Sequence, residues 1–231
     1  MKNILIAGGS SAAGVATAKV FVAAGHRVLT VGSSAERIAA AAGISGAVAM
    51  VADLSSADDV ARLHAEIAAK YGPVHGLAHL VGGWRGGGSI PEQDDADWDF
   101  LANNVIQTLR LTSREFFTEL AENSGRLAIV SSTGLAKPTA SNANYVAAKA
   151  AAEAWTLALA DGFAKVVEGR NSATAAAVIF RVKALLTEEM KAAQPERKFP
   201  GYTHVDELAA SIYDAFTGAT AELNSSIISL G

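Results

Sequence analysis

Short apolar runs alternate with longer alanine-rich stretches along the whole chain. Short β-branched or aliphatic runs are typical of strands, whereas longer stretches with large apolar groups on one side favour helices that pack on a sheet. The predicted strands are Asn3 to Ala7, Arg27 to Val31, Ala47 to Val51, Gly76 to Leu80, Arg126 to Ser131, Ala173 to Ile179 and Ser226 to Ser229. The predicted helices are Gly14 to Ala24, Ala35 to Ala42, Ala57 to Tyr71, Asp97 to Ala121, Ala143 to Val167 and Val205 to Phe216.

Strands that alternate with helices predict βα units around a parallel sheet. The predicted strands fit one doubly wound α/β sheet, and no second domain is indicated, so we expect residues 1–231 to form a single domain. The segment Gly82 to Gly88 is the most loop-like part of the chain and predicts either a mobile lip over a site or a solvated connection. The acidic residues between Asp94 and Asp99 are expected to cap the helix that follows.

Composition excludes several classes of function. The chain has 231 residues, of which 50% are apolar and 18% charged, with a net charge of −4. This balance argues against disorder and against nucleic-acid binding. The absence of cysteine excludes a thiolate nucleophile and a zinc–thiolate site. The chain runs from Met1 directly into a short apolar stretch, so we expect a cytoplasmic protein without a signal peptide or membrane contact.

A glycine-rich turn joins the first predicted strand to the first predicted helix. It reads Gly8-Gly9-Ser10-Ser11-Ala12-Ala13-Gly14. Small residues let backbone N–H groups and the positive end of the helix face a pyrophosphate, although such turns also occur for steric reasons alone. The position at the first strand-to-helix turn favours dinucleotide binding.

The end of the second predicted strand bears on the choice of dinucleotide. Sites for NAD(H) place an acidic residue there to bind the adenosine ribose, but this strand is followed by Ser33 and Ser34. With no acid to repel a 2′-phosphate, these serines and Arg37 would bind one. The sequence therefore favours NADP(H), with NAD(H) as the alternative and Arg37 as a solvated helix residue in that case.

A phenol and an ammonium, Tyr145 and Lys149, stand four residues apart on a predicted helix and therefore share one face. Ser132 lies thirteen residues before the tyrosine at a predicted strand end, and Asn104 lies in the preceding long helix. The spacing of the tyrosine and lysine is common by chance, but its combination with the serine, the asparagine and the glycine turn is not.

With these residues in this order, the whole chain resembles the short-chain dehydrogenase/reductase family. The glycine turn resembles the family's Gly-x-x-x-Gly-x-Gly motif at Gly8, Ala12 and Gly14. The resemblance implies a Rossmann-type fold, hydride transfer to or from a nicotinamide, a carbonyl or alcohol substrate, and a homodimer or homotetramer. The implied catalytic residues are Asn104, Ser132, Tyr145 and Lys149. The implied cofactor-binding residues are Gly8, Ser10, Ser11, Ala13, Gly14, Ser33, Ser34, Arg37, Asp53, Leu54, Val81, Gly82, Gly83, Tyr145, Lys149 and Thr187.

Physical chemistry supports these roles. Hydride addition to a carbonyl creates an oxyanion that needs a proton, and a phenol with a pKa near 10 exchanges protons reluctantly at neutral pH. A neighbouring Lys149 ammonium would favour the phenolate of Tyr145. Ser132 would hold the substrate oxygen, and Asn104 would position a water that relays protons to the lysine.

The chain also departs from the family pattern. Ala12 replaces the middle glycine of the turn, His79-Leu80-Val81-Gly82 replaces Asn-Asn-Ala-Gly, and Val182-Lys183 replaces Pro-Gly. Together with Gly-Gly-Trp-x-Gly-Gly, these features resemble the dihydropteridine reductase branch, which has an acid after strand two and an alanine at the serine position. This chain has Gly32 and Ser132 instead, so quinonoid pterin reduction is the alternative to carbonyl reduction.

Other residues leave alternatives open. Trp84 and Arg85 would contact a flat or anionic substrate, or Trp84 would instead pack under the loop. His75 and His79 lack nearby acidic or sulfur ligands, so no metal site is expected, and the histidine at 79 would replace a structural asparagine. The segment Thr187 to Tyr202 resembles a lid. A sensor that binds a dinucleotide without turnover is the competing class, disfavoured because the tyrosine and lysine are both present.

Overall fold

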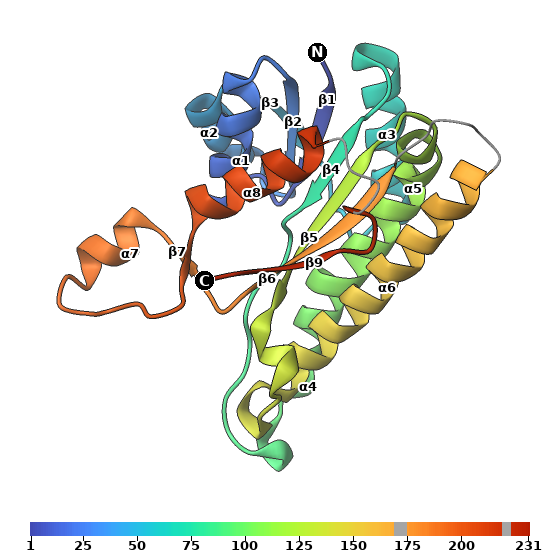
Figure 1. The fold of residues 1–231 in the computed structure, drawn as a ribbon. Helices are drawn as coiled ribbons and strands as arrows, with labels where there is room; N and C mark the ends of the chain where they lie inside the picture. The colour runs from blue at the N-terminus through green and yellow to red at the C-terminus, as the bar shows by residue number, and fades with distance from the viewer. Residues whose placement is uncertain (169–174, 219–222) are drawn as a thin grey trace.

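The computed structural model describes residues 1–168, 175–218 and 223–231 (Figure 1). The strands are β1 (Asn3–Ala7), β2 (Arg27–Gly32), β3 (Val48–Val51), β4 (Gly76–His79), β5 (Arg126–Ser132), β6 (Ala176–Val182), β7 (Leu185–Leu186), β8 (Thr203–His204) and β9 (Ile227–Leu230). The α-helices are α1 (Ala12–Ala23), α2 (Ala35–Ser45), α3 (Ala57–Tyr71), α4 (Asp95–Leu101), α5 (Thr108–Glu122), α6 (Ala143–Glu168), α7 (Glu188–Ala193) and α8 (Val205–Thr217).

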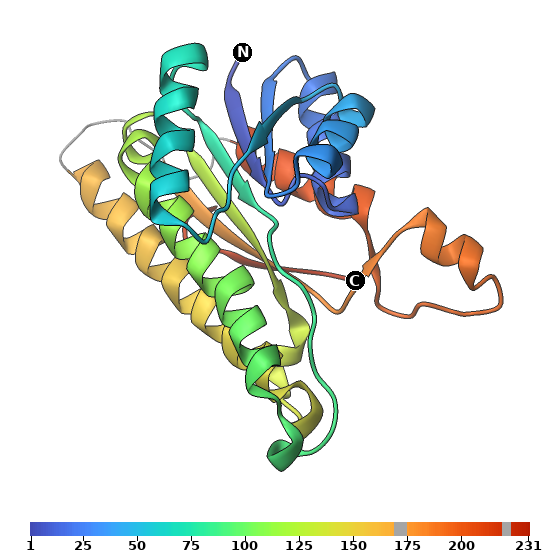
Figure 2. The same cartoon turned by 180° about the vertical axis from the view of Figure 1, so that it is seen from behind.

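Seven parallel strands form one sheet in the order β3-β2-β1-β4-β5-β6-β9. Helices α1, α2 and α8 lie on one face, and α3, α5 and α6 cover the other (Figures 1 and 2). The predicted doubly wound α/β sheet is thereby confirmed. The strand order reverses direction between β1 and β4, and ligands of such sheets bind at the carboxyl ends of the strands at this point.

Each face of the sheet carries its own apolar core. The strand residues alternate between the two, so Leu5 of β1 packs toward α3, α5 and α6, while Ile4 and Ile6 pack toward α1 and α8. All three side chains are at most 2% exposed. This burial of near-continuous apolar strands on both faces is the usual property of a parallel sheet. Among the described residues, no helix is long and apolar enough to cross a membrane.

Serine side chains fix where the first helices begin. Ser11, Ser34 and Ser56 accept hydrogen bonds from the backbone N–H groups of Gly14, Arg37 and Asp59, respectively. Such N-caps satisfy N–H groups that have no partner within the helix. The capping serines that follow β1 and β2 thus fix the points at which the chain passes from the end of a strand into a helix.

Several predicted boundaries differ from the structure. The predicted helix Asp97 to Ala121 consists of α4, a π-helical segment η2 (Ala102–Gln107) and α5. The start of the sixth predicted strand, Ala173 and Thr174, lies outside the described residues, and β6 begins at Ala176. The predicted lid contains the short helix α7, which projects away from the sheet, and β7 and β8 pair at its base (Figure 1).

Candidate active site

The glycine turn lies at the reversal point of the sheet. Gly8 follows β1 with a φ of 82°, and the backbone N–H groups of Gly8 and Gly9 both donate to Val31 O at 3.1 Å. A Cβ atom on Gly8 would lie 2.8 Å from the backbone of Leu80 and Val81 beyond β4. A Cβ atom on Gly14 would lie 2.5 Å from Gly8 O. Both glycines are therefore required by the packing of the turn itself.

A cavity of about 680 Å³ opens beside this turn and is large enough for a small ligand together with part of a dinucleotide. Ser11, Ala12 and Ala13 line it at the positive N-terminal end of α1, which favours a phosphate group. The glycine cradle and the helix end fit the pyrophosphate of a dinucleotide. They do so through backbone geometry, with no bulky side chain in the turn.

The cavity gathers three of the four predicted catalytic residues and half of the whole predicted set. Its lining includes Ser11, Ala13, Val81, Gly82, Gly83, Ser132, Tyr145, Lys149 and Thr187 from the predicted set. The predicted residues Gly8, Ser10, Gly14, Ser33, Ser34, Arg37, Asp53, Leu54 and Asn104 lie outside this lining. We call the region at β4, β5, α6 and β6 the chemical half of the site, and the region at β1, α1, β2 and α2 the outer half, of which the start of α1 also lines the cavity.

Tyr145 and Ser132 meet at the floor of the cavity. Ser132 ends β5 and is only 5% exposed, and its Oγ atom accepts from Gly134 N at 3.0 Å. Burial raises the pKa of the Tyr145 phenol, and a hydrogen bond with Ser132 partly opposes this increase. The phenol is therefore in its protonated form at neutral pH and is able to act as an acid.

Lys149 lies behind the tyrosine on the same helix, α6. Its Nζ atom donates to Val130 O at 2.7 Å and lies 5.8 Å from the centre of the Tyr145 ring. Burial lowers the pKa of the Lys149 ammonium to about 8, although the charge of Glu153 raises it in part. The ammonium is thus held next to the phenol, where its charge would stabilise a phenolate.

Asn104 lies in the π-helical segment η2 and does not line the cavity. Its side-chain Nδ2 donates to Phe100 O at 2.9 Å, and its backbone oxygen accepts from Thr108 Oγ1 at 2.7 Å. Segment η2 packs against α6, which carries the lysine. A π-helical segment often marks a functional position, because the extra residue frees backbone groups from the regular ladder.

The residues predicted to contact the adenosine half surround the start of α2 and the end of β3. Ser33 and Arg37 are exposed, and Ser34 caps α2. The Asp53 carboxylate accepts from the backbone N–H of Ser55 at 2.9 Å and so fixes the turn after β3. Leu54 is 5% exposed and belongs to the core on the α3 side of the sheet.

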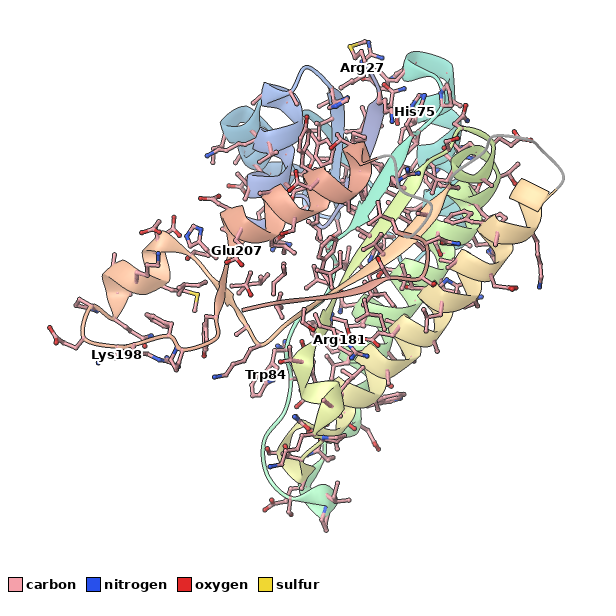
Figure 3. All side chains as sticks on the ribbon, viewed as in Figure 1. Arg27, His75, Trp84, Arg181, Lys198 and Glu207 are labelled. Carbon is pink, nitrogen blue, oxygen red and sulfur yellow. The ribbon has the colours of Figure 1, made fainter. Side chains whose placement is uncertain are left out.

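Trp84 and Arg85 point to different surroundings. Trp84 is 61% exposed, lines the cavity and lies on the side of the loop that faces the α7 segment (Figure 3). The Arg85 guanidinium instead stacks 3.9 Å from the centre of the Phe100 ring and lies 3.5 Å from Asp97. Only the tryptophan is therefore placed to contact a ligand in the cavity. The arginine attaches the glycine-rich loop to α4.

His79 ends β4 beneath the chemical half and is 3% exposed. Burial, and to a lesser degree the charge of Lys149, lowers its pKa to about 3, so the imidazole is neutral. Its Nε2 atom has no hydrogen-bond partner in the structure. The described part of the chain contains no group of three or more histidine, aspartate or glutamate side chains arranged to hold a metal.

Two charged residues behind the lysine were missed by the sequence interpretation. Glu153 follows Lys149 by one helical turn, and Arg181 of β6 binds its carboxylate through two hydrogen bonds, of 2.8 and 2.5 Å. Glu153 alone looks like an ordinary surface residue of an alanine-rich helix. The sequence did contain a signal for this pair: Arg181 lies in an otherwise apolar strand, and an arginine in such a strand requires a buried partner.

Comparison with known proteins identifies the family. The family of short chain dehydrogenases matches residues 2–176. An acetoacetyl-CoA reductase from Allochromatium vinosum is 32% identical over 110 residues, which is 47% of this chain and 44% of that protein. A 3beta-hydroxysteroid dehydrogenase from Mediterraneibacter gnavus is 31% identical over 169 residues, which is 71% of this chain and 61% of that protein. The matched regions thus span about half of these relatives.

The fold likewise has solved counterparts. The structure of a short-chain type dehydrogenase/reductase from Mycobacterium ulcerans superposes with a TM-score of 0.86 at 20% identity, covering 99% of this chain and 87% of that one. The chain belongs to the short-chain dehydrogenase family, as the family match shows. This family comprises NAD(P)-dependent dehydrogenases and reductases, so the resemblance inferred from the sequence is confirmed.

Proposed function

We propose that the protein is an NAD(P)(H)-dependent oxidoreductase that interconverts a carbonyl and an alcohol. The observation that carries this proposal is the convergence of Ser132, Tyr145 and Lys149 on one cavity beside the glycine turn. The relatives named above are a reductase and a dehydrogenase, which supports the same class of reaction.

In the direction of reduction, the bound cofactor would supply the hydride for the carbonyl carbon. Ser132 would hold the carbonyl oxygen, and the protonated phenol of Tyr145 would donate the proton that completes the alcohol. The Lys149 ammonium would stabilise the phenolate that remains. Thr187 and the backbone beyond β4 would hold the nicotinamide ring, because they line the same cavity.

Asn104 is retained as a positioning residue in this proposal. Its segment η2 packs against α6, so a water held by Asn104 would lie near the buried lysine and return a proton to it. The Asn104 side chain is itself held by a hydrogen bond from Nδ2 to Phe100 O, within its own helical stretch. The proposed holding of a water by Asn104 therefore depends on backbone groups of η2, and not on a free side-chain amide.

We further propose that NADP(H) is preferred to NAD(H). Ser33, Ser34 and Arg37 replace the acidic residue expected after β2, and Arg37 is exposed, as a phosphate-binding side chain must be. The test is the ratio of the dissociation constants for NADPH and NADH measured by fluorescence titration. A tighter constant for NADH would contradict the preference.

The activity is tested by NADPH oxidation with a panel of carbonyl compounds. The panel contains an acetoacetyl thioester, a ketosteroid, simple ketones, quinones and quinonoid dihydropterin. Consumption that depends on a ketone or thioester supports the proposal, whereas consumption with the pterin alone identifies a pteridine reductase. Tight NADPH binding with no consumption across the panel would show a sensor that binds the dinucleotide without turnover.

We also propose a homodimer or homotetramer in the cytoplasm. Trp98 of α4 and Leu157 of α6 are each 38% exposed, and a second copy of the chain would cover such apolar surface. Light scattering at several protein concentrations measures the mass directly. A monomer at every concentration would refute the assembly without affecting the proposed chemistry, because Ser132, Tyr145 and Lys149 all belong to the same chain.

A further inference from the structure

A row of alternating charges runs from the floor of the cavity into the protein. Lys149 and Glu153 are one turn apart on α6, which brings their side chains to the same face of the helix. Arg181 of β6 binds the Glu153 carboxylate from the sheet side, through Nε to Oε1 at 2.8 Å and Nη2 to Oε2 at 2.5 Å. Figure 3 labels Arg181 beside α6 near the carboxyl end of the sheet.

This carboxylate is buried and yet charged. The Glu153 side chain is 7% exposed, while that of Arg181 is 27% exposed. Burial alone would raise the pKa of the Glu153 carboxyl, but the hydrogen bonds from Arg181 and the charges of Arg181 and Lys149 lower it overall. A two-point bond between a guanidinium and a carboxylate also fixes the position of the carboxylate. Glu153 is therefore an anion of fixed position.

We propose that Glu153, fixed by Arg181, is a positioning residue whose carboxylate keeps Lys149 in its charged ammonium form at the cavity floor. The lysine needs such support, because an isolated buried ammonium loses its proton readily. The hydrogen-bond acceptor of its Nζ atom, Val130 O, is neutral. The importance of this charge for catalysis rests on the proposed function, but the electrostatic coupling itself does not.

The remaining titratable neighbours do not supply a negative charge at neutral pH. His79 of β4 is neutral, and burial keeps the pKa of the Tyr145 phenol above its usual value. The only carboxylate that raises the pKa of the Lys149 ammonium is that of Glu153, within the part of the chain that the structure describes. Removing this carboxylate therefore leaves the ammonium without an anionic partner until a phenolate forms.

The test uses two substitutions that change the same ion pair in opposite ways. Glu153→Gln removes a negative charge, and Arg181→Gln removes a positive one, with little change in shape. The titration of Lys149 is followed by NMR of protein labelled at lysine ¹³Cε, and its signal is assigned by its loss in Lys149→Met. We expect the titration midpoint to fall by about one pH unit in Glu153→Gln and to rise in Arg181→Gln.

The opposite signs separate electrostatic coupling from a structural role. Loss of the bridge as a merely structural contact would move both midpoints in the same direction or neither. The double variant Glu153→Gln/Arg181→Gln should return the midpoint toward that of the wild type. The high-pH limb of kcat for carbonyl reduction should move with the NMR midpoint, because removal of a negative charge favours proton loss from both the lysine and the tyrosine.

A matched control lies on the same helix. Asp161→Asn also removes one negative charge from α6, but twelve residues from Lys149, or about 18 Å along the axis. At this distance salt screens most of the interaction, so the midpoint should not move. A shift equal to that of Glu153→Gln would show a general charge effect and overturn the inference.

Two further results complete the test. If a single variant does not fold, Glu153→Asp replaces it: the shortened side chain draws the carboxylate away from Lys149, and a lowered midpoint is again expected, whereas an unchanged one overturns the inference. If the titration midpoint of Lys149 moves in opposite directions in the two variants, but the enzyme is inactive with every compound of the panel, the proposed function is refuted and the inference stands. If the enzyme is active but the titration midpoint of Lys149 is unchanged in both variants, only the inference is refuted.

Discussion

The two halves of the candidate site consist of different kinds of chemical groups. The outer half, at β1, α1, β2 and α2, is made of glycine, serine and backbone N–H groups, with Gly8 and Gly14 pressed against neighbouring backbone atoms. The chemical half, at β4, β5, α6 and β6, gathers the buried ionisable side chains of His79, Lys149 and Glu153.

In the proposed function, this difference separates cofactor binding from proton transfer at the carboxyl ends of the strands. Backbone groups hold a phosphate through fixed geometry and helix dipoles, with no side chain required to titrate. Proton transfer needs the reverse: side chains whose pKa values are displaced by burial and neighbouring charge, as for Lys149 and Tyr145. Substitutions in the two halves should therefore have separable effects on cofactor binding and on turnover.

The largest separation is expected for Tyr145→Phe. The change removes the proton donor and leaves the ring, so kcat should fall by about a thousandfold or more, which is about 4 kcal/mol of transition-state stabilisation. The dissociation constant for NADPH should stay within about twofold, because the glycine turn is untouched. Stopped-flow turnover and fluorescence titration measure the two quantities.

Tyr213→Phe is the matched control for this substitution. Tyr213 is half-buried on α8 and packs edge-on against Phe21, outside the cavity lining. It should leave both kcat and cofactor binding unchanged. Retained carbonyl reduction in Tyr145→Phe would eliminate the proposed acid, and an equal loss in both variants would show a general effect of removing a phenol.

The converse result is expected for Gly8→Ala. The new Cβ atom would lie 2.8 Å from the backbone beyond β4, and the φ of 82° disfavours alanine. We expect a loss of about 2–3 kcal/mol in the free energy of unfolding, together with weaker NADPH binding. Thermal unfolding with and without NADPH measures both effects.

Gly25→Ala separates backbone strain from the clash. Gly25 has a similar φ of 80°, but nothing lies within 4 Å of its Cβ position. This variant should lose only about 1 kcal/mol and bind NADPH normally. Equal destabilisation in the two variants, or normal NADPH binding in Gly8→Ala, would contradict the assignment of the turn.

His79 makes the chemical half sensitive to acid. Its pKa is lowered to about 3 in the folded protein, below the usual value of 6.5. Between these values the unfolded chain binds a proton that the folded chain does not, so the free energy of unfolding falls as the pH decreases below about 6.5. The loss is about 1.4 kcal/mol per pH unit.

His79→Asn should remove this part of the acid sensitivity. Urea unfolding at about pH 6 and pH 5 gives the slope for each protein, and the variant should show a smaller decrease by about 1.4 kcal/mol. At about pH 7 to 8 the slopes should agree, because the imidazole is then neutral in both states. Equal slopes in the acidic range would mean that His79 is not held neutral by burial.

Much of this contrast could be predicted from the sequence. The glycine turn, the strands and the helical spacing of Tyr145 and Lys149 follow from local patterns, and the family resemblance added Ser132. The structure confirms the fold and brings these three side chains to one cavity. Local patterns suffice there because a strand-to-helix turn and a four-residue helical spacing each fix their geometry over a few residues.

The rest depends on long-range packing. The pairing of Glu153 with Arg181 joins residues 28 positions apart, and no local period indicates it. The π-helical segment was predicted as regular helix, because the sequence around Asn104 continues the helical pattern. Arg85 was predicted to contact a substrate, but its stacking on Phe100 depends on how the loop folds onto α4.

The smallest effect is expected at the outer edge of the binding half, for Arg37→Ala. Arg37 is exposed on the first turn of α2, so an ion pair with a 2′-phosphate would be screened by solvent. We expect NADPH to bind up to about fivefold more weakly, a loss of about 1 kcal/mol, while NADH binding stays the same.

The neighbouring variant Glu36→Ala supplies a control of opposite charge. Glu36 lies in the same first turn, and its removal should leave NADPH binding unchanged or slightly tighter, since an anion near the phosphate is lost. The two dissociation constants are measured by the same titration at low and high salt. If Arg37→Ala weakens the binding of NADH as much as that of NADPH, the arginine stabilises α2 and does not bind the 2′-phosphate. Phosphate binding in this half would then depend on backbone N–H groups and on the serines that follow β2.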